Sequence, residues 1–223
     1  MERICAIFSH YRRISLTEMC LQKLAQQTVP PHRVVVADNG AGDGSLDGVK
    51  EQAAAGAYPF MLEIIDMPGN TGNAGGIARG LERAFSFPDV DAVWILDDDS
   101  WPEPDALACL LSHGPGTDGM EWPCVRGCKV VDLKQGGELS WPMVLLDEKD
   151  GRRIHVTRGD ALPEAPFLLT GGAFLGALVP REIHDKVRGP TAGLFIRGED
   201  EEYPWIISRA GFRTYLVLSL IHI

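Results

Sequence analysis

A short apolar run that ends abruptly in three acids constrains the fold of this chain more than any other feature. The run is Val93–Leu96, and Asp97, Asp98 and Asp99 follow it directly. An apolar run this short and this sharply bounded is typical of a strand buried on both faces of a sheet. Three ionised carboxylates would lose their hydration if they were buried without partners, so we expect them at the carboxyl end of that strand. That edge is where α/β sheets place their ligands.

The acidic run also indicates what kind of ligand the sheet edge takes. Carboxylate oxygens at this density suit Mg²⁺ or Mn²⁺, and such an ion keeps coordination positions for substrate phosphates. A solvated acidic turn would give the same local pattern, and the run alone does not separate the two. The net charge of −10 argues against nucleic acid as a partner, because nucleic-acid phosphates need a cationic protein face. It does not exclude a nucleotide, whose charge a metal ion can offset.

Length and composition indicate one domain in a reducing compartment. A chain of 223 residues, with 45% hydrophobic and 23% charged residues, is typical of a single soluble α/β domain. Its five cysteines are an odd number without a disulfide-rich pattern, which favours a reducing cytosol. Cys124 and Cys128 lack the second pair that a zinc site would need. We find no signal peptide and no apolar stretch near the ~20 residues of a membrane span.

The rest of the chain alternates apolar runs with stretches of helical spacing, which is typical of parallel βαβ units. Residues 134–165 are polar and rich in turns, and we interpret them as an excursion with one or two short strands that carries Trp141. Exposed indoles often stack on sugar rings, although a core or edge role for this tryptophan is as consistent with the sequence. The expected strands are 4–8, 34–37, 61–66, 93–96, 125–132, two within 167–179, and 214–223. The expected helices are 16–27, 45–57, about ten residues ending at 85, one opened by 102–105, 180–187, and 201–210 with Pro204 in its first turn.

A loop with four glycines, 68–76, follows the third expected strand. Glycines let backbone approach a ligand closely, and the helix that follows offers its N-terminal amides to an anion. A tight turn that needs small residues is the alternative. The loop is not G-x-G-x-x-G and follows the third strand rather than the first, which disfavours a dinucleotide-binding fold.

Four motifs in a fixed order resemble a known family over most of residues 4–217. They resemble those of the inverting, nucleotide-sugar-dependent glycosyltransferases of family 2, which have the GT-A fold, and especially the rhamnosyl- and galactofuranosyltransferase-like branch. No single motif is specific, and the strength of the resemblance comes from their order and spacing. The motifs are Val36-Ala-Asp38-Asn39-Gly40, Asn70-x-Gly72-x-Ala74-Gly75-Gly76, Trp94-Ile-Leu-Asp97-Asp98-Asp99-x-x-Pro102 and Gly198-Glu199-Asp200-x-Glu202-Tyr203.

The resemblance implies a GT-A, Rossmann-like α/β fold. In that fold a mostly parallel central sheet is flanked by helices, and a small antiparallel β excursion lies near the C-terminal half. The resemblance implies a single catalytic domain over 1–223, with a nucleotide-binding half at 1–112 and a half for acceptor and catalytic base at 113–223. Family members continue with C-terminal helices that help to place the acceptor or the membrane. We therefore expect the chain to be truncated at its C-terminus, and peripheral membrane association to depend on that missing region.

The resemblance also assigns site residues. Asp97 and Asp99 match the family's D-x-D carboxylates, which hold the ribose and a divalent ion, Mn²⁺ or Mg²⁺, on the diphosphate. The family usually completes this metal site with a later histidine, for which His222 is the candidate although it falls short of the family's spacing. Nucleotide-sugar binding would fall to residues after the first three strands, to the glycine loop with its helix, and to the acidic run: Ser9, Arg12, Asp38, Asn70, Gly72, Asn73, Gly76, Arg79, Asp97 and Asp98.

Asp200 matches the family's catalytic base, and Glu199 is the rival candidate. Transfer of a glycosyl group needs a cation that neutralises the departing diphosphate, and a carboxylate that accepts the proton of the acceptor hydroxyl. One base suffices for a single displacement with inversion, whereas glycoside hydrolases use a carboxyl pair that flanks the bond. The alternative role of Glu199 is to join Glu201 and Glu202 in an acidic first turn of a helix, which the helix dipole favours.

We therefore expect an inverting hexosyltransferase of cell-wall or polysaccharide biosynthesis. It would move a sugar from a nucleoside-diphosphate sugar, a UDP-linked hexose such as galactofuranose or another hexose rather than dTDP-rhamnose, to a glycan or lipid-linked saccharide. We expect it in the cytoplasm at the inner face of the membrane. A nucleotidyltransferase that makes a nucleoside-diphosphate sugar is one alternative, but the first strand lacks the basic G-x-G-type loop expected after it. A non-catalytic nucleotide- or sugar-binding fragment is the other, and it would bind ligand without turnover.

Overall fold

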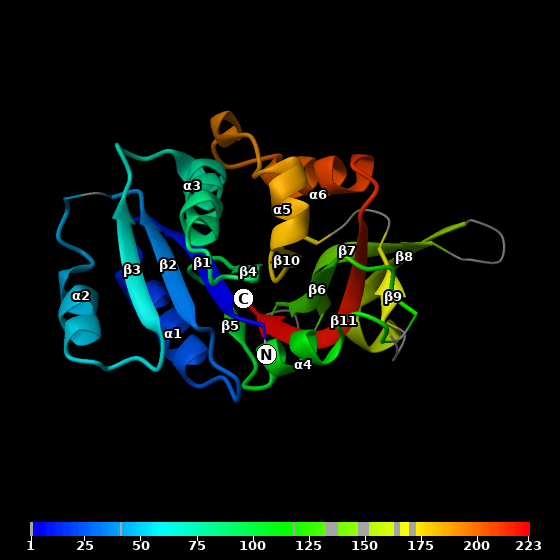
Figure 1. Ribbon diagram of the computed structural model, residues 1–223, viewed down its shortest axis with the longest axis horizontal. Coiled ribbons are helices and arrows are strands. Elements are labelled where there is room, and N and C mark those ends of the chain that lie inside the picture. Colours follow the sequence, from blue (N-terminus) through cyan, green and yellow to red (C-terminus); the bar gives the residue numbers. More distant parts are fainter. Residues whose placement is uncertain are drawn as a thin grey trace.

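The computed structural model describes residues 2–40, 42–117, 119–132, 138–146, 152–162, 166–169 and 173–223. A mixed β-sheet runs through the molecule, with helices on both of its faces (Figure 1). The described strands are β1 (Ile4–His10), β2 (Arg33–Asp38), β3 (Met61–Asp66), β4 (Ala92–Ile95), β5 (Trp101–Pro102), β6 (Cys124–Val131), β7 (Glu138–Leu146), β8 (Arg153–Arg158), β9 (Phe167–Leu168), β10 (Leu178–Pro180) and β11 (Arg213–His222). The described helices are α1 (Ile14–Ala25), α2 (Asp47–Ala54), α3 (Gly72–Ser86), α4 (Ala106–Ser112), α5 (Arg181–Val187) and α6 (Glu199–Arg209), with 3₁₀ turns η2 (Gly159–Ala161) and η3 (Ala192–Leu194).

The sheet divides into a parallel half and a mostly antiparallel half. Its strand order is β3-β2-β1-β4-β10-β6-β11-β5. Strands β1 to β4 pair in parallel, whereas β10 runs antiparallel to both β4 and β6, and β7 forms an antiparallel pair with β8. The prediction of an α/β fold with a mostly parallel central sheet and an antiparallel excursion is confirmed.

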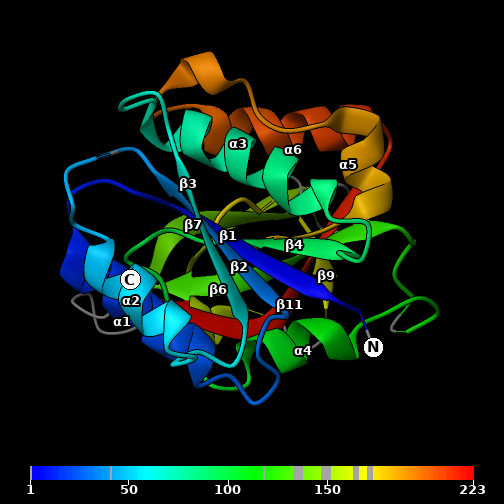
Figure 2. The same ribbon diagram turned by 60° about the vertical axis from the view of Figure 1, so that its left-hand side comes forward.

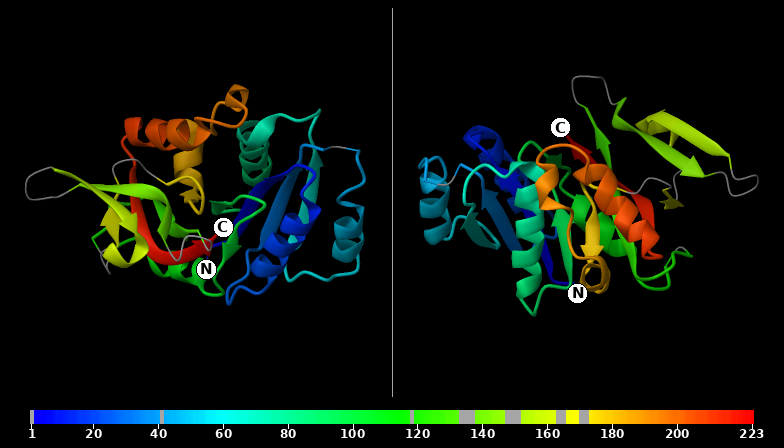
Figure 3. Two further views of the ribbon diagram at one scale, coloured as in Figure 1. Left: turned by 180° about the vertical axis from the view of Figure 1, so that it is seen from behind. Right: turned by 90° about the horizontal axis from the view of Figure 1, so that it is seen from above.

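Helices cover the two faces of the sheet in separate groups. Helices α3, α5 and α6 lie on one face, and α1, α2 and α4 lie on the other (Figure 2). The views from behind and from above show the same division (Figure 3). Strand β1 sends alternate residues into the two cores, with Ile7 packing in one and Phe8 in the other. This two-sided burial explains why the early strands read as continuous apolar runs.

Helix α3 begins earlier than the sequence predicts. Its first residue is Gly72, so most of the expected loop is helical. Glycine has a low helix propensity, so the sequence predicts a loop here, but the packing of α3 against β1 outweighs that propensity. A Cβ added to Gly76 would lie 2.7 Å from Cβ of Ser9, and one added to Gly80 would lie 3.4 Å from Cβ of Ile7. These glycines therefore let α3 approach the sheet closely.

Helix α6 also begins earlier than predicted, at Glu199. Pro204 consequently lies inside the helix rather than in its first turn. Because proline has no backbone N–H, it cannot donate to the carbonyl of Asp200 four residues before it. Among the residues that the structure describes, no helix is both long and apolar enough to cross a membrane.

Candidate active site

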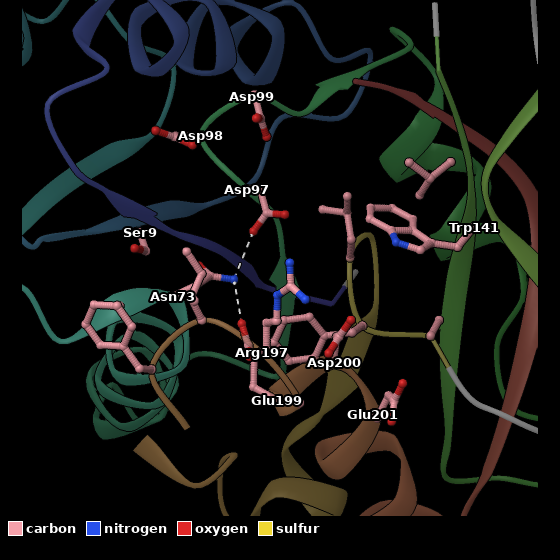
Figure 4. Close-up of a pocket in the computed structure, with 18 of the residues that line it drawn as sticks. Ser9, Asn73, Asp97, Asp98, Asp99, Trp141, Arg197, Glu199, Asp200 and Glu201 are labelled. Carbon is pink, nitrogen blue, oxygen red and sulfur yellow. Dashed lines mark hydrogen bonds between the residues drawn. The ribbon is translucent and has the colours of Figure 1, made fainter. Parts of the chain in front are cut away.

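A cavity of about 1200 Å³ lies where β1, β2 and β4 end. Figure 4 shows Ser9 and Asn73 on one side of it and Trp141 on the other, with Arg197 and Asp200 between them. The polar side comes from the ends of β1 to β4 and the start of α3: Ser9, Asn39, Asn70, Asn73 and the acidic run. The mostly apolar side comes from β6, β7 and the segment between β9 and β10: Cys128, Val130, Trp141, Met143, Leu169, Ala173, Phe174 and Leu175.

The acidic run turns sharply at the end of β4. The backbone N–H of Asp97 donates to Oγ of Ser100 at 3.0 Å, and this bond helps to close the turn. Asp98 is only 2% exposed and forms a two-point ion pair with Arg13. Nη1 of Arg13 also donates to Oδ2 of Asp99 at 3.0 Å. One arginine therefore holds two of the three acids.

Asp97 and Asp98 resist ionisation. Burial raises the pKa of Asp97 to about 7, and the negative charges of Asp99 and Asp98 add to this effect, while a hydrogen bond from Asn73 opposes it. Burial raises the pKa of Asp98 to about 6, against the opposing charge of Arg13. Asp97 thus keeps a proton close to neutral pH, and a bound cation would take the place of that proton.

Asn73 links the acidic run to the start of α6. Its Nδ2 donates to Oδ1 of Asp97 at 3.3 Å and to Oε1 of Glu199 at 3.4 Å, as the dashed lines in Figure 4 show. Glu199 is 4% exposed, and its Oε2 has no hydrogen-bond partner among the described residues. The next residue, Asp200, is exposed and lines the cavity. The structure therefore brings Asp97, Asp99, Glu199 and Asp200 to one cavity.

Two carboxylates of the acidic run face the cavity, and they are the oxygen donors that the sequence predicts for a metal ion. In the described part of the chain, no group of three or more His, Cys, Asp or Glu side chains is arranged to hold a metal ion. Asp97 and Asp99 offer hard oxygen donors on one wall. This set fits Mn²⁺ or Mg²⁺, because such ions take their remaining ligands from substrate phosphates and water.

His222 does not join these acids in the structure. It lies on β11, where its backbone pairs with Trp101 beyond the acidic run. Its Nε2 lies 2.5 Å from Oε1 of Glu103, and the residue is not part of the cavity lining. The pairing of β11 with β5 therefore separates this histidine from the acids it was expected to join.

Four predicted ligands of the nucleotide-sugar lie outside the cavity lining: Arg12, Asp38, Gly76 and Arg79. Asp38 is 3% exposed, and its Oδ1 accepts a hydrogen bond from the backbone N–H of Gly40 at 2.9 Å. The guanidinium of Arg79 pairs with Glu82 on the solvent side of α3, at 2.6 Å. Ser9, Asn70, Gly72, Asn73, Asp97 and Asp98 do line the cavity.

The N-terminal amides of α3 are largely used within the protein. The backbone N–H of Thr71 donates to Oδ1 of Asn39, that of Gly72 to Oδ1 of Asn70, and that of Ala74 to the carbonyl of Phe195. These three amides are therefore not free to bind an anion. Their acceptors are the side-chain oxygens of Asn39 and Asn70 and the backbone carbonyl of Phe195.

Several cavity residues were not predicted from the sequence. Asn39 is the centre of a network, since its Nδ2 donates to Oγ of Ser9 and to the carbonyl of Gly72. Its place in the Asp38-Asn39-Gly40 motif could have indicated that it belongs to the site. Arg13 gave no such signal, because the acids that it pairs with, Asp98 and Asp99, are distant in sequence. Arg197 gave none either, because it lies just outside the motif that begins at Gly198.

Comparison with known families and curated proteins gives consistent matches. A family model described as "Glycosyl transferase family 2" matches residues 5–126. The galactofuranosyltransferase GlfT1 of Mycobacterium tuberculosis is 31% identical over 229 residues, which cover 99% of this chain and 70% of that protein. The galactofuranosyltransferase GlfT1 of Mycolicibacterium smegmatis is 26% identical over 230 residues, which cover 99% of this chain and 71% of that protein.

Solved structures share the fold at low sequence identity. S. aureus TarS superposes with a TM-score of 0.65 at 14% identity, covering 100% of this chain and 36% of TarS. GalNAc-T7 with UDP, GalNAc and Mn²⁺ gives 0.71 at 12% identity, with 100% and 44% coverage. The mannosyltransferase PcManGT from Pyrobaculum calidifontis, in complex with GDP-Man and Mn²⁺, gives 0.63 at 20%, with 98% and 56% coverage. The chain thus spans 36% to 56% of these three structures.

Proposed function

This chain belongs to glycosyl transferase family 2, as its ordered motifs predict, and on that basis we propose that it transfers a galactofuranosyl residue from a UDP-linked donor to a saccharide acceptor, with inversion. The observation that carries this proposal is the meeting of Asp97, Asp99 and Asp200 in one cavity. The names of the curated relatives support the choice of sugar. The structures of GalNAc-T7 and TarS with UDP support the choice of base.

The donor is proposed to occupy the polar side of the cavity. Ser9, Asn39 and Asn70 line this side beside the strand ends, where α/β folds take nucleotides. Asp97 and Asp99 would hold Mn²⁺ or Mg²⁺ next to the diphosphate. When bound, that ion neutralises the charge that develops on the departing group.

Asp200 is the proposed general base, because it is exposed in the cavity whereas Glu199 is buried against Asn73. The acceptor hydroxyl oxygen forms a bond to the anomeric carbon as the bond from that carbon to the diphosphate oxygen breaks. The bonding electron pair leaves with UDP, and the hydroxyl proton passes to a carboxylate oxygen of Asp200. Attack and departure on opposite faces invert the anomeric carbon.

The acceptor is proposed to lie on the apolar side. Trp141 is 51% exposed at this wall, whereas a tryptophan of the core would be covered by its neighbours. An exposed indole in a cavity wall can stack on the apolar face of a sugar ring. We infer a glycan or lipid-linked saccharide as acceptor. All five cysteines are free, which supports the proposed cytoplasmic location.

A binding screen followed by a transfer assay tests this function. Thermal shifts with UDP, GDP and dTDP, each with and without Mn²⁺, should show stabilisation by UDP that depends on the metal. Asp99→Ala should lose this shift. Asp200→Asn should keep it but lose about 10²- to 10⁴-fold in transfer from UDP-galactofuranose, as expected for a missing general base. Asp47→Asn, an exposed change on α2, is the control. UDP binding that is equal without metal and in Asp99→Ala would contradict the proposal.

A further inference from the structure

Arg197 is a cation in the cavity that has no partner among the residues that the structure describes. Six acidic side chains line this cavity, and its two basic ones are Arg13 and Arg197. Arg13 is already bound to Asp98 and Asp99. The side chain of Arg197 makes no ion pair or hydrogen bond with any residue that the structure describes. Figure 4 shows its guanidinium between Asp97 and Asp200, with Trp141 farther to the right.

The loop that carries Arg197 is held in an unusual conformation. Phe195 has φ of 65° although it is not glycine, and Gly198 has φ of 97°. The carbonyl of Phe195 accepts a hydrogen bond from the backbone N–H of Ala74 at 2.9 Å, which fixes the loop to the start of α3. A bulky residue in the left-handed region costs free energy and is found mainly at functional sites. Backbone strain is therefore concentrated next to Arg197, whose guanidinium has no partner in the described part of the chain.

Because the cavity lining carries a net negative charge, a diphosphate needs a cation to bind there. A diphosphate entering a site lined by six carboxylates and two arginines meets net repulsion, even with Asp97 partly protonated. A divalent ion on the acidic wall offsets only part of this repulsion. A guanidinium offers a planar fork of N–H donors that matches two phosphate oxygens.

We propose that Arg197 binds the β-phosphate of the donor, a step that rests on the proposed function. As the bond between the anomeric carbon and the β-phosphate oxygen breaks, the electron pair stays on that oxygen and the acceptor proton goes to Asp200. The guanidinium keeps its proton throughout and stabilises the new charge. The same chemistry would recognise a phosphate on the acceptor, so the experiment must separate the two sources.

Calorimetric titration of UDP and UMP in the presence of Mn²⁺ separates them. Arg197→Gln should weaken UDP binding at least tenfold and leave UMP, which has no β-phosphate, within about twofold. Arg197→Lys should lose less, because it keeps the charge without the fork. Arg209→Gln is the matched control, since this exposed arginine on α6 lies over Trp205. Thermal melts establish that each variant is folded.

Three outcomes would overturn the assignment. UDP affinity in Arg197→Gln within twofold of wild type removes Arg197 from the donor, and a selective rise in KM for a phosphorylated acceptor would then place it on the acceptor. Equal losses for UDP and UMP would place it away from the β-phosphate. If the wild-type protein binds no UDP with Mn²⁺, the proposed function itself is contradicted. If the wild-type protein binds UDP and Arg197→Gln binds it equally well, only the role of Arg197 is contradicted.

Discussion

Replacing Gly72 by alanine should disconnect the loop before α6 from the start of α3. Gly72 has φ of 71°, a region that alanine enters at a cost of about 1–2 kcal/mol. An added Cβ would also lie 2.0 Å from the carbonyl oxygen of Phe195, which is backbone and cannot rotate away. Overpacking of this kind costs about 1–3 kcal/mol. We therefore expect a free energy of unfolding lower by about 2–5 kcal/mol, with the loop displaced.

The assay is urea unfolding followed by circular dichroism, combined with UDP titration below the melting transition. For a chain of this size, such a loss lowers the melting temperature by roughly 4–20 °C. UDP affinity should fall as well, because the displaced loop carries Arg197 and leads into Glu199. Gly193→Ala is the matched control in the same loop, since an added Cβ there meets nothing within 4 Å. Its stability should stay within about 0.5 kcal/mol of wild type.

A Gly72→Ala protein that unfolds like Gly193→Ala would show that the carbonyl of Phe195 leaves room for an added Cβ. A destabilised protein with wild-type UDP affinity would contradict the expected loss of UDP binding, because it would show that the loop before α6 does not shape the site.

The remaining predictions concern the acidic run, its link to α6 and the apolar wall. Binding of UDP with Mn²⁺ should be about tenfold weaker at pH 6 than at pH 8, because the pKa of Asp97 is about 7 and its proton must leave before a cation binds; calorimetry that finds equal affinities contradicts this. Asn73→Ala should lower kcat more than it raises KM for the donor, since Asp97 and Glu199 lose their common partner; steady-state kinetics with unchanged kcat would exclude that role. Trp141→Ala should raise acceptor KM about two- to tenfold, as expected for one lost ring contact, with UDP affinity unchanged in titration; a loss of UDP affinity would move this indole to the donor side.

The parallel half of the fold could be predicted because its strands are buried on both faces. Val34, Val35 and Val36 are all fully buried, so the sequence carries a continuous apolar signal with clear ends. The acids that follow Leu96 could be placed at the sheet edge by the same reasoning, since burial without partners would cost too much. Local composition was sufficient for these features.

The starts of α3 and α6 could not be predicted, because contacts distant in sequence decide them. Gly72 is a poor first residue for a helix in isolation, and only the packing of the α3 glycines on β1 makes the helix favourable. The hydrogen bond between Asn73 and Glu199 joins residues 126 positions apart. No local pattern reports such a pair, and the same holds for Arg13 with Asp98.

The choice between Glu199 and Asp200 shows how a helix boundary sets chemistry. Both residues follow Gly198, whose φ of 97° turns the chain into α6. Successive residues of an α-helix point about 100° apart, so a helix that begins at Glu199 must separate the two carboxylates. Glu199 turns inward to Asn73 and is 4% exposed, which leaves Asp200 as the accessible acid in the cavity. Had the helix begun two residues later, as the sequence suggests, both acids would lie in the preceding loop without this separation.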